Sequence, residues 1–390
     1  MTRSENGAAF GQVLGWALFI AGIFFLNFLS RVTFGPLMPV IREELGISHA
    51  QAGSIFLMVA VGNALGLLLS GFVSRRLGHR RTVGVSGLIV GLMCLSIGFC
   101  DGLATLRAFT GLLGLAAGIY LPSGLTSITT LIRRADWGKA LAIHELAPNT
   151  AFVLAPLLAE AALLQGDWRD AFRLLGALQL LAGCAFLWRG RGADFPGIVP
   201  SPGAMLAVLR RPVFWLFALL FSLAVGASVG PYSMLPLYLV DDHGYARPDA
   251  NGLLAAARVA GIFLPFFAGW LADRMGGRAA LVLYLALTGS ATVGLGLASG
   301  PWLPTMVLLQ PALSVLFYPP AFSLLSAAFD DSERSLAVSL LTPISATVGL
   351  GLTPTLLGWL GDHGLFGLGF TGQGVLLLAA LLLFPTMPRR

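Results

Sequence analysis

Residues 71–80 read GFVSRRLGHR, and residues 269–278, about 198 positions further along the 390-residue chain, read GWLADRMGGR. Glycine and arginine recur at matching places in the two stretches. Further matches occur at the same offset of 198 residues: 120–122 (YLP) with 318–320 (YPP), 43–46 (EELG) with 241–244 (DDHG), and Pro156 with Pro354. Pro39 and Pro236 match at an offset that differs by one residue. This alignment indicates an internal repeat of about half the chain.

The repeat is built from long apolar runs. The chain is 56% hydrophobic and 11% charged, whereas soluble globular proteins carry about 25% charged residues. This composition excludes a water-soluble enzyme with an ordinary surface. A helix that spans a bilayer needs about 20 mostly apolar residues. Twelve runs meet this length, at residues 13–40, 50–74, 82–100, 103–132, 140–164, 171–188, 212–240, 251–271, 279–298, 302–328, 336–360 and 368–386.

The longest polar interruption, residues 189–211, is rich in Gly, Pro and Arg and divides these runs six to six. We therefore expect an all-α membrane protein with an N-terminal six-helix bundle over residues 1–188 and a C-terminal six-helix bundle over residues 212–390. The region between them is predicted to be a cytoplasmic linker whose later part forms a short interfacial helix. Because six is even, both bundles start on the same side of the membrane, and a pseudo-two-fold axis relates them.

The distribution of basic residues predicts the orientation. Most of the 24 basic residues lie in the tails and in the loops that join even-numbered to odd-numbered runs. The positive-inside rule then places both termini in the cytoplasm of a multi-pass protein of the cell (inner) membrane. The first run is too long for a cleaved signal peptide. Membrane orientation also explains the net charge of +6 better than nucleic-acid binding does.

The loop motifs resemble those of a known family. The pattern Gly-x-x-x-Asp-Arg-x-Gly-x-Arg over residues 269–278 resembles the signature loop of the major facilitator superfamily, and the copy at 71–81 lies in the family's usual place between helices 2 and 3. Arg107-x-x-x-Gly111 resembles a second family motif. The resemblance implies two six-helix bundles around a central cavity, with substrate bound near mid-membrane. It also implies a cytoplasmic gate built from Gly71, Arg76, Gly78, Gly269, Asp273, Arg274, Gly276 and Arg278.

The chemistry of these loops suits a gate. The first glycine of each copy would let two helices approach closely, and the second would turn the chain sharply. Asp273 beside Arg274 could form an ion pair across the cytoplasmic mouth. Arg75 stands where the family usually has Asp, so we expect a gate latch that differs between the two halves.

Ionisable side chains within spans are the main candidates for function, because they are costly to bury. Arg31 lies ~15 Å along its helix from the outer end at Ile41, using a rise of 1.5 Å per residue, and Asn27 precedes it by one turn on the same face. This segment resembles helix 1 of organic-anion and organophosphate transporters of the superfamily, in which an arginine meets the substrate's negative charge. The alternative is a structural arginine bonded to backbone carbonyls or to a partner in its own bundle.

The second candidate arginine is Arg258, ~10 Å along its helix from Asn251 by the same rise. It resembles the carboxylate-binding arginine of monocarboxylate and oxalate transporters, although Leu254 replaces the acidic residue one turn earlier. Two guanidinium groups would hold a carboxylate in bidentate fashion and would keep an empty cavity attractive to anions. The alternative for Arg258 is a side chain that reaches to the outer interface.

The fifth run carries His144, Glu145 and Asn149. A buried carboxyl group or an imidazole can carry a proton, so we predict Glu145 as the coupling residue, with His144 as the other candidate. Alternatively, the pair braces the cytoplasmic gate. Asn149 is a lesser polar candidate for substrate binding. We expect Glu160 to be a rim residue and Arg107 to be structural.

Tyr120 and Tyr318 occupy equivalent places in the fourth and tenth runs, each with Pro two residues later. The family resemblance implies that these helices line the cavity. The hydroxyl groups could donate to an anion from both halves, and the prolines could loosen the helices where rocking requires bending. The alternative is aromatic packing alone.

Other motifs do not support an enzyme. His144-Glu145 starts like a zinc signature, but Pro148 stands at the place of the second histidine, and the cysteines Cys94, Cys100 and Cys184 form no metal set. No phosphate-binding loop with lysine is present, which argues against direct ATP use. The stretch 84–87 (GVSG) resembles the serine motif of intramembrane proteases; glycine-mediated helix contact explains it better. We expect no metal and no cofactor.

Together these features predict a secondary active transporter of a small organic anion, a carboxylate, coupled to protons and working by rocker-switch alternating access. The alternative is a proton-driven multidrug or metabolite exporter, although the fifth run lacks the Gly-Pro-rich signature of drug exporters. The expected partners are the anion, protons and the lipid bilayer, with no nucleic acid. The protein is expected to work as a monomer.

Overall fold

The computed structural model describes residues 8–197, 199 and 201–386. Within this part of the chain, twelve helical segments are long and apolar enough to cross a membrane, which confirms the all-α prediction and the number of spans. The only extended pairing found among the described residues is an isolated bridge between Ala8 and Ile132. The spans are Phe10–Leu45, His49–Leu77, His79–Ile97, Leu103–Leu131, Arg134–Gln165, Trp168–Arg189, Pro212–Asp242, Arg247–Met275, Gly277–Leu297, Trp302–Ala328, Glu333–Gly361 and Phe366–Leu383.

The chain forms two compact units. The first unit comprises Met1–Phe34 and Met58–Pro200, and the second comprises Gly35–Leu57 and Ser201–Arg390. Gly35–Leu57, which includes the part of the first span from Gly35 to Leu45, belongs to the second unit. The division into bundles at 1–188 and 212–390 stays a prediction.

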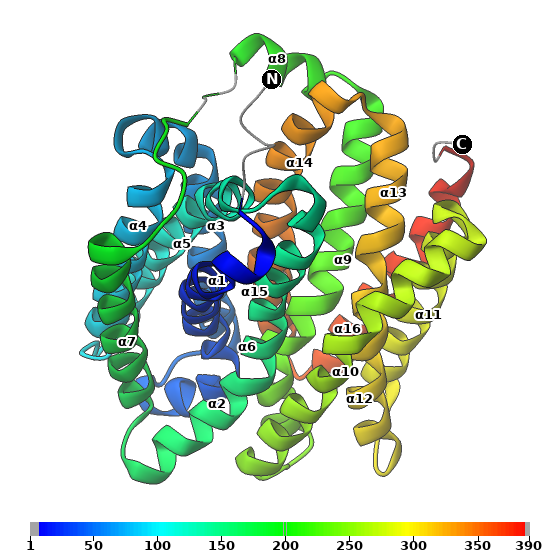
Figure 1. Ribbon diagram of the computed structural model, residues 1–390. Coiled ribbons are helices and arrows are strands. Elements are labelled where there is room, and N and C mark those ends of the chain that lie inside the picture. The colour runs from blue at the N-terminus through cyan, green and yellow to red at the C-terminus, as the bar shows by residue number, and fades with distance from the viewer. Residues whose placement is uncertain (1–7, 198, 200, 387–390) are drawn as a thin grey trace. The chain divides into compact units, whose positions relative to one another are not determined.

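In the first unit, most spans consist of one uninterrupted α-helix. The α4 helix lies between α5 and α7, and α1 packs against α6 (Figure 1). Its elements are α1 (Phe10–Val32), most of α3 (His49–Leu77), α4 (His79–Ile97), α5 (Leu103–Leu131), η1 (Arg134–Asp136), α6 (Trp137–Gln165) and α7 (Trp168–Arg189).

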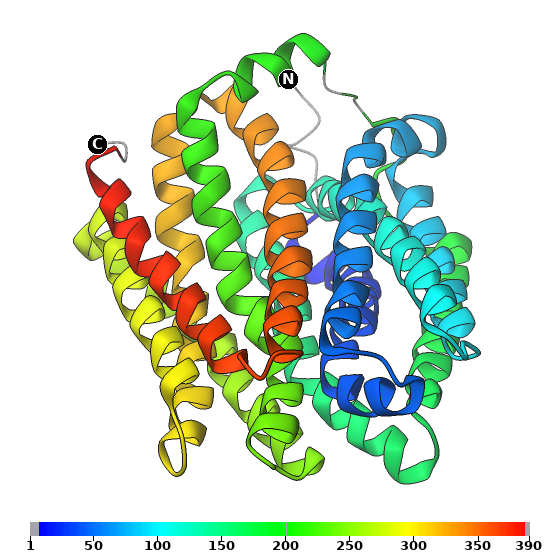
Figure 2. The ribbon, with the colours of Figure 1, turned by 180° about the vertical axis from the view of Figure 1, so that it is seen from behind.

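The second unit has more interrupted helices. In it α11 runs beside α16, and α9 runs beside α14 (Figure 2). Its elements are α2 (Phe34–Leu45), α8 (Pro202–Leu209), α9 (Pro212–Leu237), η2 (Tyr238–Asp242), α10 (Arg247–Met275), α11 (Gly277–Leu297), α12 (Trp302–Ser314), η3 (Val315–Phe317), α13 (Tyr318–Ala328), α14 (Asp331–Ala346), η4 (Thr347–Leu352), α15 (Thr353–Gly361), α16 (Phe366–Ala379) and η5 (Ala380–Thr386). The short helix expected late in the linker is α8, capped by the Ser201 side chain; its interfacial position stays a prediction.

Helix-internal prolines explain several interruptions in the second unit. Three short segments depart from α-helical geometry: η2 and η4 are π-helical, and η3 is a 3₁₀-helix. They begin within four residues of Pro236 (η2), Pro311 (η3) and Pro343 (η4). Proline has no backbone N–H to donate, so the helix locally widens or tightens around it. In the first unit, α5 continues through Pro122 without such an interruption.

Left-handed glycines mark equivalent turns in the two copies of the repeat. Gly78 has φ of 77° and Gly276 has φ of 82°, each directly before the next helix. Gly46 and Gly244, which pair in the repeat, have φ of 58° and 67°. Positive φ is strained for residues with a Cβ atom. Gly78 and Gly276 therefore occupy sharp turns that favour glycine, and their role in a gate stays a prediction.

Glycines also bring α3 and α5 into backbone contact within the first unit. A Cβ atom added at Gly62 would lie 2.0 Å from the carbonyl oxygen of Gly111, and one at Gly118 would lie 2.2 Å from that of Asn63. Small residues allow this approach in membranes, where close packing replaces the hydrophobic effect as the force between helices.

We expect Gly118→Ala to destabilise the protein by about 1–3 kcal/mol, because the added methyl group meets backbone atoms that cannot move aside. A thermal unfolding curve of the purified protein measures this as a lower melting temperature. The matched control is Gly111→Ala on the same helix, where the nearest atom to the added Cβ lies 3.8 Å away. Equal melting temperatures for the two variants would contradict the packing argument.

Candidate functional site

Arg31 lies in the last turn of α1, deep within the first span. Its Nε donates to the carbonyl oxygen of Asn27 at 3.4 Å, and its guanidinium lies over the Phe28 ring, 4.9 Å from the centroid. The side chain is half-buried. No carboxylate of the described residues lies within ion-pair distance of it. A guanidinium at this depth that keeps donors for a further acceptor is suited to bind an anion.

Asn27, predicted to share substrate binding with Arg31, is fully buried. Neither its amide nitrogen nor its amide oxygen has a hydrogen-bond partner within the described structure. Its backbone carbonyl accepts from Arg31 and from Ser30 Oγ. Asn27 therefore positions Arg31 through its backbone, and direct contact of its side chain with substrate stays a prediction.

Arg258, on α10 in the second unit, is held by α9. Its Nη1 donates to Ser228 Oγ at 3.2 Å, and its Nη2 donates to the Ser228 carbonyl oxygen. The guanidinium also lies 4.9 Å from the centroid of the Tyr232 ring. Only 4% of the residue is exposed, so the side chain does not reach to an interface in the described structure. Serine and tyrosine thus fix the direction of this cation before any ligand arrives.

His144 forms a stack of rings in the first unit. The ring lies 4.2 Å from the Phe24 ring at an interplanar angle of 7°, and Phe24 stacks in turn on Tyr120. His144 is completely buried, whereas the side chain of Glu145 is 64% exposed. Adjacent helical residues point about 100° apart, and here that separation places the imidazole inside the unit and the carboxylate at its surface.

The hydrogen bonds indicate which nitrogen of His144 can accept a proton. Tyr120 Oη donates its hydrogen to the Ile20 carbonyl oxygen at 2.8 Å, so it accepts from His144 Nε2, 3.3 Å away. The remaining ring nitrogen, Nδ1, lies 3.5 Å from Glu145 Oε1. In the neutral ring this nitrogen carries a lone pair. A proton taken up at Nδ1 would therefore lie beside a carboxylate.

The two tyrosines predicted to act alike have different surroundings. Tyr120 is fully buried and bonded as described, while Tyr318 is 40% exposed and packs near Phe221 and Phe322. Donation from Tyr120 to a substrate would require its bond to Ile20 to break. Asn149 donates its amide N–H to the Glu145 carbonyl oxygen at 3.0 Å. Substrate contact by either tyrosine or by Asn149 stays a prediction.

The ion pair expected across the cytoplasmic mouth stays a prediction. Asp273 and Arg76 are exposed, and neither takes part in an ion pair among the described residues; Arg274 lies over the Trp270 ring, 5.3 Å from its centroid. The expected close approach at Gly269 is wrong for this structure, because an added Cβ there would meet no described atom within 4 Å. Gly71 lies within α3, and Arg278 lies at the start of α11.

Several residues around these sites were not predicted. Phe24, Ser228 and Tyr232 position the candidate side chains, yet each lies in an apolar run without a distinguishing motif. Ser86, the nucleophile of the hydrolase alternative, is buried and donates to the Ala116 carbonyl oxygen at 2.6 Å. That bond satisfies the hydroxyl group as a helix-packing contact.

The spans and the arginines buried within them define a multi-pass membrane protein with polar sites at bilayer depth. The profile of the Major Facilitator Superfamily matches residues 20–316 and 250–390, and the chain belongs to this family. Its membership confirms that the chain is a transporter-family protein and not an enzyme.

Among curated proteins, the chain is similar to the probable sulfoacetate transporter SauU of Cupriavidus necator, with 27% identity over 158 residues, which is 40% of this chain and 37% of the relative. It is similar to the membrane sensor protein UhpC of Escherichia coli, with 24% identity over 67% of this chain and 63% of the relative. The probable nitrate/nitrite transporter NarK2 of Mycobacterium tuberculosis is 24% identical over 71% of this chain and 70% of the relative. The matches thus span less than two thirds of the first two relatives.

Solved structures show the same fold. A bacterial homologue of the human lysosomal transporter Spinster, in an inward-facing and occupied conformation, has a TM-score of 0.80 at 17% identity, covering 97% of each chain.

Proposed function

We propose that this protein is a secondary active transporter of a small organic anion that carries a carboxylate, with Arg31 and Arg258 as the binding cations. The observation that carries the proposal is Arg31, a half-buried guanidinium deep in a span whose described partners are one carbonyl oxygen and one aromatic ring. Two relatives are named for transport of anions, sulfoacetate and nitrate or nitrite. A guanidinium fork matches the paired oxygens of such groups.

We also propose that transport is coupled to protons through His144, with Glu145 as its neighbouring carboxylate. The support is geometric: Nε2 is engaged by Tyr120, and Nδ1 lies toward Glu145. Glu145 is exposed and can exchange protons with water, while the buried imidazole can hold one. Rocker-switch alternating access, an inner-membrane location and cytoplasmic termini complete the proposal.

A thermal-shift panel on the purified protein tests the substrate class. The panel contains sulfoacetate, nitrate, acetate and glycolate, with acetamide and glycolamide as uncharged matches and lipophilic cations as representative drugs. A ligand present at 100 times its Kd stabilises the folded state by about 2.7 kcal/mol. We expect stabilisation by at least one organic anion and none by its amide. Stabilisation by drugs or amides alone would reject the proposal in favour of an exporter of uncharged or cationic compounds.

A further inference from the structure

The segment Gly35–Leu57 is fastened to the rest of the second unit at one end of its helices. A Cβ atom added at Gly358 on α15 would lie 2.2 Å from the His49 carbonyl oxygen, and one at Gly53 on α3 would lie 2.6 Å from that of Pro354. Asn251 Nδ2 donates to the Pro36 carbonyl oxygen at 3.2 Å. The segment and its neighbours are therefore in backbone contact, and the predicted orientation places this end outside the cell.

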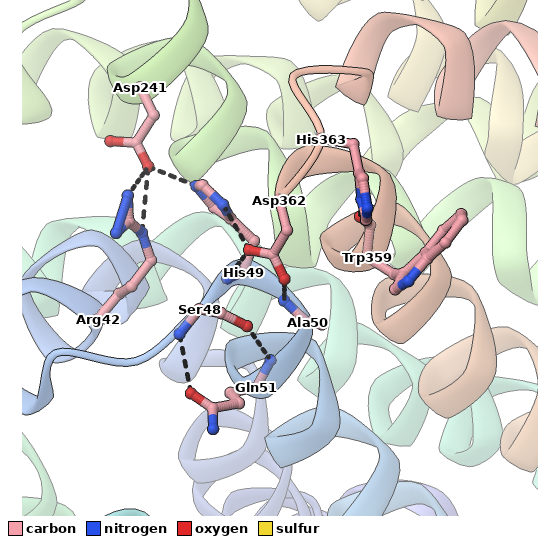
Figure 3. A network of polar contacts seen from close by, with 9 residues as sticks. All are labelled: Arg42, Ser48, His49, Ala50, Gln51, Asp241, Trp359, Asp362 and His363. Carbon is pink, nitrogen blue, oxygen red and sulfur yellow. Dashed lines mark hydrogen bonds and ion pairs between the residues drawn. The ribbon is translucent and has the colours of Figure 1, made fainter.

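Four charged side chains lie at this contact: Arg42, His49, Asp241 and Asp362 (Figure 3). We name them the His49 cluster. Arg42 Nη2 lies 3.0 Å from Asp241 Oδ2. His49 Nε2 lies 2.8 Å from the same oxygen, and His49 Nδ1 lies 3.1 Å from Asp362 Oδ1. Both carboxylates belong to the part of the unit beyond residue 201, so each interaction crosses from the segment to its neighbours.

Asp362 also caps the helix that His49 begins. Its Oδ1 accepts from the His49 backbone N–H at 2.6 Å, and its Oδ2 accepts from that of Ala50 at 3.0 Å. A carboxylate at a helix N-terminus satisfies unpaired N–H groups and the positive end of the dipole. Ser48 and Gln51 complete the cap through a reciprocal pair of hydrogen bonds. Partial burial raises the pKa of Asp362, but the hydrogen bonds from Ala50 and His49 outweigh it and hold that pKa below its ordinary value.

The geometry around the His49 ring determines which protonation state makes both of its ion-pair contacts favourable. An ionised carboxylate only accepts hydrogen bonds, and a neutral imidazole has one donor and one acceptor nitrogen. Because both ring nitrogens of His49 lie against carboxylate oxygens, both contacts are favourable only when the ring is doubly protonated. A neutral ring would direct a lone pair at one of the two oxygens.

The other titratable groups described near the His49 cluster do not take over the role of the second His49 ring proton. Asp242 on η2 adds negative charge near His49, and His243 packs its ring against Tyr238. The His49 ring and the Phe366 ring on α16 are nearly perpendicular, with 5.0 Å between their centroids. His363 follows Asp362, but its Nδ1 lies 2.8 Å from the Trp359 carbonyl oxygen. Among the histidines that the structure describes at this end, His49 is the one placed between two carboxylates.

We propose that His49 is a proton-controlled latch that holds segment Gly35–Leu57 against the rest of the second unit when the ring is charged. The inference rests on the proposed carrier function, because a carrier must release this contact to open that end of its helices. The contribution of the imidazolium is present while the ring is doubly protonated and is lost when the ring gives up a proton as pH rises. The contribution of the Asp362 carboxylate is present above about pH 4 and is lost as pH falls. The latch is therefore weakened at high pH by loss of the His49 proton and at low pH by protonation of the Asp362 carboxylate.

Distance measurements between two spin labels test the latch without any substrate, so their outcome is independent of the substrate proposal. The labels are placed at Glu43→Cys on α2 and Ala246→Cys before α10, both exposed positions, in the full chain carrying Cys184→Ala. We expect the ratio of short to long distances to rise at least about fivefold from pH 8.5 to 5.5, the lower end of typical coupling between sites.

The variants distinguish His49 from its neighbours. His49→Gln should remove the pH response, and His49→Arg, which keeps a positive charge at all pH values, should give a high short-distance population at both. The matched control His363→Gln should respond like the parent protein. Size-exclusion chromatography and thermal unfolding of each unlabelled variant confirm that it is folded. A pH response that persists in His49→Gln, that disappears in His363→Gln, or that is absent in the parent protein would overturn the proposal.

Discussion

Binding of the transported anion is expected to weaken by on the order of 30-fold or more when Arg31 is replaced by glutamine, because loss of one partner from a buried charge pair costs about 2–5 kcal/mol. Glutamine keeps a donor of similar length but has no charge. Arg31 lies about 21 Å from Leu45 along the first span, using 1.5 Å per residue, where water screens little. Isothermal titration of the purified protein with the anion identified by the thermal-shift panel measures the change.

Two further variants distinguish an effect of the Arg31 charge on binding from a general effect of arginine removal. Arg31→Lys keeps the charge but loses the planar fork, so we expect affinity between those of the parent protein and Arg31→Gln. Arg189→Gln at the end of α7, an exposed arginine that stacks on Trp188, should bind with unchanged affinity. Equal affinity of Arg31→Gln and the parent protein would show that Arg31 is structural.

The twelve spans could be predicted because their signal is local. A run of about 20 apolar residues in a chain with 11% charge has few other structures available to it. The turns at Gly78 and Gly276 could be predicted for a related reason, since a motif glycine that ends a helix favours a left-handed turn. These features depend on residues that are neighbours along the chain.

The surroundings of the candidate residues could not be predicted, because they depend on contacts between distant segments. The serine and tyrosine that hold Arg258 lie 30 and 26 positions before it, in a run where every residue is compatible with a buried helix. His49 and Asp362 are 313 residues apart. Single residues at helix ends carry no period and no motif, so only the fold brings them together.

The irregular turns of the second unit show the same limit. Prolines at 122, 236, 311 and 343 are all internal to helices, yet only the last three are followed by a change of helical geometry. The helix geometry depends on whether other groups bond to the carbonyl oxygen that the proline leaves without its backbone donor. The proline alone therefore indicates where a helix can bend and does not determine that it does.

The two arginines differ in preorganisation, which bears on their proposed roles. Arg258 is bonded to Ser228 and covered by Tyr232, so little side-chain entropy remains to be lost on binding. Arg31 has a longer contact, 3.4 Å to the Asn27 carbonyl oxygen, and more freedom to turn toward a ligand. Under the proposed function, Arg258 would provide a fixed positive group, and Arg31 would reorient when the anion binds.

Replacing His144 by glutamine is expected to abolish proton-driven accumulation of the anion while exchange of anion for anion continues. A gradient of one pH unit stores about 1.4 kcal/mol, enough for roughly tenfold accumulation per coupled proton. Without a group that gains and loses the proton, the ratio of internal to external anion should fall to that set by the membrane potential. Proteoliposomes with an imposed pH gradient and clamped potential measure accumulation, and counterflow measures exchange.

Glu145→Gln provides the decisive comparison on the same helix. The carboxylate lies 3.5 Å from His144 Nδ1 and its side chain is 64% exposed, so its loss should reduce proton-driven accumulation without abolishing it. His363 is far along the chain, and its Nδ1 lies 2.8 Å from the Trp359 carbonyl oxygen. His363→Gln should therefore change neither accumulation nor exchange of the anion. If instead Glu145→Gln alone abolishes accumulation and His144→Gln retains it, the exposed carboxylate carries the proton, and the buried ring serves only to hold α6 against α1 and α5 through Phe24 and Tyr120.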